Sequence, residues 1–113
     1  MGLSRLFSRS ADRNADEIAH EELAAALRSD ACVLVDVREP QEFSAGHIAG
    51  AINMPLSSFD SSRLPDGKAV VLVCRSGARS ASALSRTRAA GHGNIRHYRH
   101  GVIGWTNAGG ALV

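Results

Sequence analysis

Apolar residues 70–73 form an uninterrupted run that ends on Cys74 and gives way to the polar segment 75–80. Four consecutive Val or Leu residues without polar alternation predict a strand that is buried on both faces of a sheet. Residues 80–90 are rich in Ala, Ser and Arg and are followed by Gly91, which predicts a helix with a glycine stop. Cys74 therefore begins a strand-to-helix loop.

The remaining pattern alternates between short apolar runs and amphipathic segments. Strands are predicted at Ile18 and at residues 32–37, 51–54 and 94–98, and helices at residues 20–27, 39–45 and from 101 onward. Residues 57–67 are interpreted as a loop or irregular helix because they contain Pro65-Asp66-Gly67. Alternating strands and helices predict one α/β domain with a central, mainly parallel sheet of about five strands flanked by helices.

The composition sets the size and the class of the protein. A chain of 113 residues is long enough for one domain, and its 44% hydrophobic fraction is typical of globular proteins. We interpret residues 1–15 as a flexible or short helical leader and residues 16–113 as the domain. An Arg- and Ser-containing start also leaves an organellar transit peptide as an alternative. No apolar run reaches membrane-spanning length, so no membrane span is expected.

Two features of the loop after Cys74 favour a reactive thiol. Backbone N–H groups of residues 75–80 can converge on the sulfur, next to the partial positive charge of a helix N-terminus. Arg75 and Arg79 add two formal charges. Such surroundings lower a cysteine pKa from about 8.5 to between roughly 3.5 and 7.5. The alternative is a buried structural cysteine that happens to precede a turn, and only a thiol that solvent can reach serves as a nucleophile.

Motifs upstream and downstream of this loop follow a known order. The resemblance extends from about Ile18 to Val113, and together these segments resemble the rhodanese-like sulfurtransferases. The segments that carry it are Asp36-Val37-Arg38-Glu39, Glu42-Phe43, Gly46-His47-Ile48, Gly50-Ala51, Asn53-Met54-Pro55, the loop from Cys74 to Arg79, and Gly101 with Trp105. His100 stands where the family usually has a second glycine, which puts the path of the chain toward the final helix in doubt.

The resemblance implies a thiosulfate sulfurtransferase that works in two steps. Cys74 would take the outer sulfur of a small anionic donor, hold it as a persulfide, and pass it to cyanide, a thiol or a protein acceptor. The donor would bind to the loop residues Arg75, Ser76, Gly77, Ala78, Arg79 and Ser80. The resemblance argues for a structural His47, no cofactor is expected, and no His or Cys spacing resembles a metal site.

Asp36 and Arg38 lie at the end of the predicted strand 32–37, and the carboxyl ends of parallel strands share one edge of a sheet. We therefore expect both near the Cys74 loop as supporting residues. Asp36 is predicted to accept hydrogen bonds from loop amides or from Arg79. Arg38 has the alternative role of pairing with Glu39 or Glu42 and fastening the following segment.

Charge is distributed unevenly along the chain. None of the 11 acidic residues lies beyond Asp66, whereas seven Lys and Arg residues do. This field favours small anions, while a net charge of only +2 without interleaved aromatics argues against nucleic acid. The presence of only two cysteines, Cys32 and Cys74, indicates a reducing compartment and a cytoplasmic location.

Two other functions compete with sulfur transfer. A cysteine phosphatase would require five residues between the cysteine and the arginine, whereas four separate Cys74 from Arg79. A non-catalytic or carrier rhodanese module would act through a protein partner, and the presence of the thiol does not exclude it.

Overall fold

The computed structural model describes residues 15–113 and contains a four-stranded, fully parallel sheet with the strand order β2-β1-β3-β4. The strands are β1 (Cys32–Asp36), β2 (Ile52–Asn53), β3 (Ala69–Val73) and β4 (Ile95–His97). The predicted fold class is confirmed, although the segment expected to be a first strand at Ile18 contributes only an isolated bridge between Glu17 and His97. The predicted leader, apart from Ala15, lies outside the described residues.

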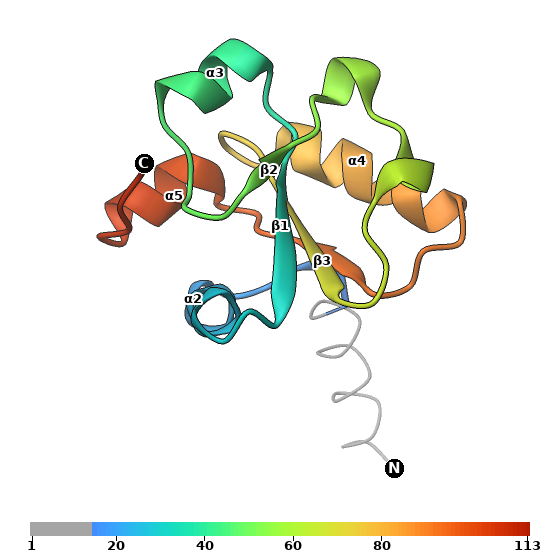
Figure 1. Ribbon diagram of the computed structural model, residues 1–113, viewed down its shortest axis with the longest axis horizontal. Helices are drawn as coiled ribbons and strands as arrows, with labels where there is room; N and C mark the ends of the chain where they lie inside the picture. The colour runs from blue at the N-terminus through green and yellow to red at the C-terminus, as the bar shows by residue number, and fades with distance from the viewer. Residues whose placement is uncertain (1–14) are drawn as a thin grey trace, which may run out of the picture.

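Helices cover both faces of the sheet (Figure 1). Helices α2 (His20–Arg28) and α5 (Gly101–Asn107) cover one face, where Leu23 and Val102 join the core with β-strand residues. Helix α4 (Ala78–Ala89) covers the other face through Ala83 and Leu84. Apolar side chains on both sides explain why residues 32–35 of β1 and all of β3 are hydrophobic.

Alternation along β1 and β3 assigns each side chain to one of these two cores. Val71 and Val73 face α2 and α5, whereas Leu72 and Cys74 face α4. The register pairs Asp36 with Val73, so the ends of the two central strands lie side by side. Cys74 therefore leaves the sheet on the α4 side.

Between β1 and β3 the chain forms short helices. Helix α3 (Pro40–Ala45) begins with a capping box. The Glu39 side chain accepts the backbone N–H of Glu42, and the Glu42 side chain accepts the backbone N–H of Glu39. Two 3₁₀ helices, Leu56–Ser58 and Ser61–Arg63, occupy the predicted irregular stretch before β3. Within residues 15–113, no helix combines the length and apolarity needed to cross a membrane.

Candidate active site

Cys74 follows the last residue of β3 and lies under the loop that leads into α4. The Gly77 N–H donates to Cys74 Sγ at 3.1 Å, and Sγ lies 3.5 Å from the hydroxyl of Ser80. Gly77 adopts the left-handed conformation, with φ of 109°, as the N-cap residue of α4. This turn brings the backbone amides of Ser76, Gly77 and Ser80 toward the sulfur.

Helix α5 fixes the orientation of this loop. Its Val102 and Ile103 N–H groups donate to the carbonyl oxygens of Cys74 (2.9 Å) and Arg75 (3.2 Å). The approach is so close that a Cβ on Gly101 would lie 2.2 Å from the Arg75 oxygen. Because α5 binds the carbonyl groups at the start of the loop, amides further along it, such as that of Gly77, face the sulfur instead.

The surroundings of Cys74 lower the pKa of its thiol. Burial opposes ionisation, but hydrogen bonds from the Ser80 hydroxyl and from the backbone amides of Ser80, Gly77 and Ser76 outweigh it. Both arginines of the loop were expected to contribute their charge. In the structure, the largest effects that lower the Cys74 pKa come from the loop backbone and Ser80, while Arg79 adds a Coulomb interaction with Cys74.

The side chain of Cys74 is closed off from solvent, with only 1% of the residue exposed. This differs from the open thiol that a nucleophile requires. Arg75, Ser76 and Ala78 are exposed on the outer side of the loop, whereas Gly77 is buried next to the sulfur. The loop residues expected to bind a donor therefore include both exposed and buried positions beside an enclosed sulfur.

The guanidinium of Arg79 binds a carboxylate and is not reserved for an anion at the sulfur site. Its guanidinium forms a two-pronged ion pair with Glu42 of α3, with N–O distances of 2.6 and 3.0 Å. Glu42 consequently has its pKa lowered to about 2, mainly by these hydrogen bonds. Glu42 neutralises much of the charge that a donor anion would otherwise meet at Arg79, and Arg75 has no ion pair among the described residues.

Asp36 and Arg38 bind each other instead of the loop. Arg38 donates to both Asp36 carboxylate oxygens at 2.8–3.0 Å, and its second contact is the carbonyl of Gly46 at 2.8 Å. Both side chains are buried. The prediction that Asp36 accepts from loop amides or Arg79, and that Arg38 pairs with Glu39 or Glu42, is wrong. Strand alternation turns Asp36 away from the Cys74 face, so the pair fastens the segment after β1.

Sequence reasoning missed His97, whose Nδ1 lies 2.9 Å from Ser80 Oγ. His97 ends β4 and shares its α4-facing side with Ile95, two residues earlier. That two-residue spacing was visible in the sequence, but only the sheet order places β4 beside β3. Glu42 was missed as a partner of Arg79 because 37 residues separate them.

The segment between β4 and α5 tolerates His100 where a second glycine was expected. His100 has φ of −74°, an ordinary helical value that requires no glycine. Gly101, in contrast, has φ of 68° and is packed directly against the backbone of the loop. The path toward the final helix is therefore preserved. Trp105 is partly buried and packs against Tyr98 and His20.

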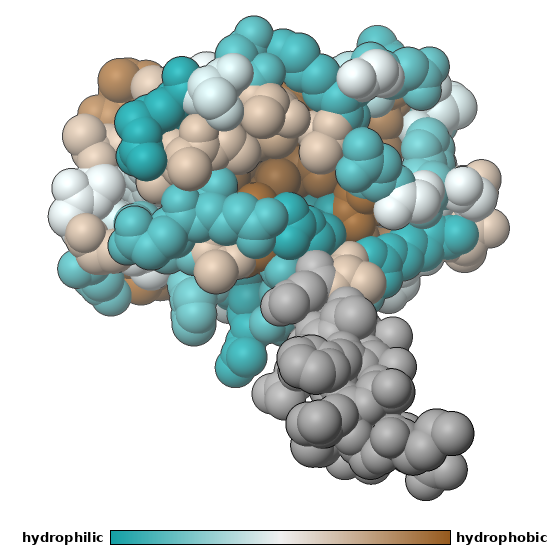
Figure 2. Space-filling model, turned by 90° about the horizontal axis from the view of Figure 1, so that it is seen from below, coloured by the Kyte–Doolittle hydropathy of each residue, from teal (hydrophilic) through white to brown (hydrophobic). Residues whose placement is uncertain are grey.

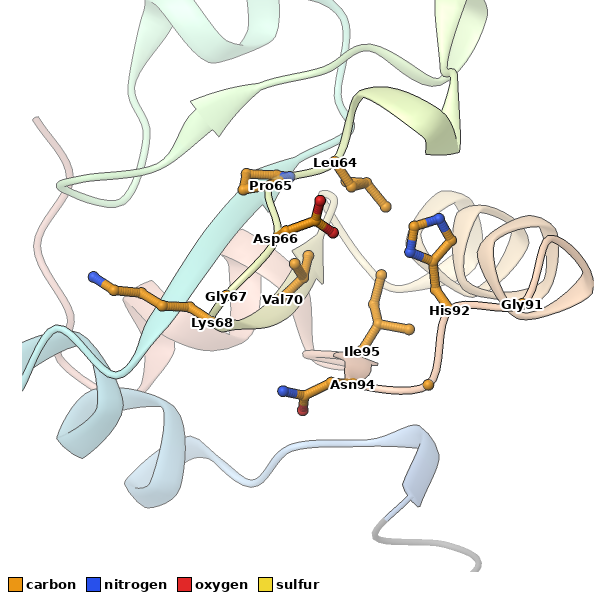
Figure 3. A pocket seen from close by; sticks show the side chains of 11 residues that line it. Leu64, Pro65, Asp66, Gly67, Lys68, Val70, Gly91, His92, Asn94 and Ile95 are labelled. Carbon is orange, nitrogen blue, oxygen red and sulfur yellow. The ribbon is translucent and has the colours of Figure 1, made fainter.

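A hollow of about 430 Å³ lies at the other edge of the sheet, where β3 and β4 begin. Figure 3 shows Asp66, Lys68, His92 and Asn94 around it. From below, the surface at this end shows polar side chains around a small apolar depression (Figure 2). The length of β3 separates this hollow from Cys74. In residues 15–113, no cluster of three His, Cys, Asp or Glu side chains is arranged to hold a metal ion.

Comparison with known proteins agrees with this architecture. Residues 19–108 match the family described as Rhodanese-like domain. The chain belongs to the rhodanese-like family. This rhodanese-like domain is 45% identical over 94 residues to an uncharacterised protein of Synechocystis, covering 81% of the chain but only 52% of that protein. It is 36% identical over 101 residues to a protein of Allochromatium vinosum named Sulfurtransferase, covering 87% of this chain and 94% of that one.

Among solved structures, the rhodanese-like domain resembles a rhodanese-related protein from Thermoplasma volcanium. The two superpose with a TM-score of 0.78 at 31% identity, covering 87% of this chain and 97% of the other. The chain spans about half the length of its Synechocystis relative but nearly all of the Allochromatium and Thermoplasma proteins. The likeness thus covers the whole sheet and the Cys74 loop.

Proposed function

We propose that this rhodanese-like domain transfers sulfane sulfur through a persulfide on Cys74. The observation that carries the proposal is the hydrogen bonding of Sγ by the Gly77 amide and Ser80, which lowers the pKa of the thiol at the start of a helix. Membership of the rhodanese-like family and similarity to a protein named Sulfurtransferase support it. Thiosulfate is the proposed donor because the loop is basic and small.

The proposed reaction has two steps that conserve charge. The Cys74 thiolate attacks the outer sulfur of thiosulfate, the sulfur–sulfur bond of the donor breaks, and sulfite leaves with the bonding electrons. The persulfide anion that remains accepts hydrogen bonds from the same loop donors, as an oxyanion does in acyl transfer. Cyanide, a small thiol or a protein thiolate then takes the terminal sulfur and restores the Cys74 thiolate.

Enclosure of Cys74 adds one requirement to this cycle. With 1% of the residue exposed, the donor reaches Sγ only after exposed loop residues such as Arg75 and Ser76 move aside. Such motion of a short surface loop is compatible with turnover, since loops of this kind rearrange in nanoseconds to microseconds. The proposal therefore includes a transient opening of the loop.

The first test uses Cys74→Ser. Intact-mass measurement after incubation with thiosulfate is expected to show one added sulfur atom on the parent protein and none on the variant. Thiocyanate formation from thiosulfate and cyanide should disappear with it. Cys32→Ser is the matched control, because Cys32 is a buried core residue on β1. Persistent thiocyanate formation by Cys74→Ser would disprove the assignment of the nucleophile.

Burial of Cys74 favours a second candidate, a non-catalytic or carrier module that acts through a protein partner. A non-catalytic module predicts no sulfur on Cys74 after exposure to thiosulfate, mercaptopyruvate or a protein persulfide. A carrier predicts loading by the protein persulfide alone. Hydrolysis of p-nitrophenyl phosphate without sulfur loading would point to phosphatase chemistry, which the four-residue spacing between Cys74 and Arg79 disfavours.

A further inference from the structure

Three buried side chains are connected from the sulfur through Ser80 to His97. Cys74, Ser80 and His97 are 1%, 0% and 6% exposed. Ser80 Oγ lies 3.5 Å from Cys74 Sγ and 2.9 Å from His97 Nδ1. The three residues come from the end of β3, the first turn of α4 and the end of β4. The cycle described above uses Ser80 as a donor but leaves His97 without a role.

The Ser80 hydroxyl has one hydrogen and three neighbours that can accept it. Besides Cys74 Sγ and His97 Nδ1, there is the Gly77 carbonyl oxygen, to which the Ser80 hydroxyl donates at 3.1 Å in the structure. That carbonyl oxygen also accepts the N–H of Ala81 at 3.0 Å, so it keeps one hydrogen bond when the Ser80 hydroxyl hydrogen rotates toward another acceptor. The remaining competition for the hydrogen is between a thiolate and an imidazole nitrogen. A Nδ1 without hydrogen would hold the Ser80 hydrogen at 2.9 Å and deprive the sulfur of it.

We propose that His97 is a positioning residue for the sulfur site: its Nδ1–H donates to Ser80 Oγ and thereby directs the single Ser80 hydrogen to the sulfur of Cys74. In this arrangement the hydroxyl oxygen accepts from His97 and donates to the thiolate or persulfide. This inference extends the proposed function. It depends on that function in one respect, which is that Cys74 is the reacting group.

The charge state of His97 makes the position of its ring hydrogen decisive. Burial lowers the pKa of His97, while the carboxylates of Glu17 and Asp16 oppose this and the arginines Arg99 and Arg88 add to it. The imidazole is therefore neutral at neutral pH and carries one ring hydrogen. Only the tautomer with that hydrogen on Nδ1 lets Ser80 donate to sulfur.

The test measures the pKa of Cys74 from the pH dependence of its alkylation by iodoacetamide. Peptide-resolved mass spectrometry separates Cys74 from Cys32. His97→Leu removes the donor and is expected to slow alkylation about three- to tenfold below the thiol pKa, which corresponds to a rise of about half to one pKa unit. His97→Asn, which offers an amide donor from a similar position, should recover most of the rate.

A double-mutant cycle decides whether His97 acts through Ser80. In a Ser80→Ala background, His97→Leu is expected to have no further effect on the Cys74 pKa. His20→Leu is the matched control, because His20 is a half-buried histidine that bonds the Tyr98 hydroxyl at 2.9 Å on the other face of the sheet. Circular dichroism shows whether each variant retains its fold.

Three results would overturn the inference. One is an unchanged Cys74 pKa in folded His97→Leu, and another is an equal shift in the Ser80→Ala background. The third is a ¹⁵N spectrum that places the His97 ring hydrogen on Nε2. Failure of the proposed function is distinguishable, because a protein that never acquires sulfur on Cys74 would still show the alkylation shift.

Discussion

Single side chains around Cys74 separate into those that act on the sulfur and those that hold the frame. Ser80 contacts Sγ directly, whereas the guanidinium of Arg79 is occupied by Glu42. Asp36 and Arg38 form an ion pair with each other, and Arg38 also donates to the Gly46 carbonyl oxygen after α3. Residues that look alike in the sequence, such as Arg75 and Arg79, therefore differ in the charge that they present to a donor.

The Glu42–Arg79 pair should give a pH-dependent contribution to stability. The pKa of Glu42 in the folded protein is lowered from 4.5 to about 2, so the pair stabilises the fold fully above about pH 4.5 and is lost as pH falls toward 2. Both side chains are about one-third exposed, so solvent limits the effect to about 1 kcal/mol or less. Between pH 5 and pH 2, thermal unfolding should shift less in Glu42→Gln than in the parent; equal shifts would contradict the assignment.

The buried Asp36–Arg38 pair should matter more for stability than for reactivity. Asp36→Asn leaves the buried Arg38 guanidinium without its counter-charge, and breaking such a pair costs about 3 to 5 kcal/mol. Urea unfolding is the measurement, and the partly exposed pair variant Glu42→Gln is the control. If Asp36→Asn instead slowed sulfur loading of Cys74 while the free energy of unfolding stayed unchanged, a role at the site would replace the structural one.

At the scale of elements, the loop is held between the start of α4 and the start of α5. Gly77 and Gly101 allow this contact, since added Cβ atoms would lie 2.4 Å from the Arg99 oxygen and 2.2 Å from the Arg75 oxygen. Both oxygens belong to the backbone, so they cannot move aside as the end of a flexible side chain could. The shape of the sulfur site thus depends on two helices, α4 and α5, that are separate in the sequence.

Gly101→Ala should therefore damage the site as well as the fold. Its φ of 68° is in the left-handed region, where a non-glycine residue costs about 1 to 3 kcal/mol, and the contact with Arg75 adds to that. Gly91→Ala is the control, because Gly91 has φ of 97° with no atom within 4 Å of an added Cβ. We expect a greater loss of stability and a raised Cys74 pKa in Gly101→Ala only; a Cys74 pKa unchanged in both would show that α5 does not orient the loop.

The sequence predicts those features that depend on neighbouring residues, and it does not predict those that depend on the packing of distant segments. Strands such as β3 and the helix after Cys74 are encoded in runs of neighbouring residues, so their positions were predicted within a few residues. The partners of Asp36 and Arg79 depend on which face of the sheet each side chain takes, and on where α3 packs. The link between Ser80 and His97 depends on β4 lying next to β3, which no local pattern specifies.

For the whole molecule, the two edges of the sheet differ in character. The carboxyl edge carries the Cys74 loop with Arg75 and Arg99 exposed beside it, while the other edge carries the hollow near Lys68 and His92. Glu42 cancels Arg79, and Arg99 has only a loose 4.0 Å contact with Glu17. The positive field that reaches solvent near Cys74 therefore originates mainly from Arg75 and Arg99.

This field should make capture of an anionic donor dependent on salt. Arg75→Ala is expected to lower kcat/KM for thiosulfate several-fold at low ionic strength, and the difference should shrink above 0.15 M salt, where charges are screened beyond about 8 Å. Lys68→Ala removes the same charge from the opposite edge and should leave kcat/KM unchanged. Equal losses in both variants would mean that net charge alone attracts the donor, because only a local field distinguishes the two edges.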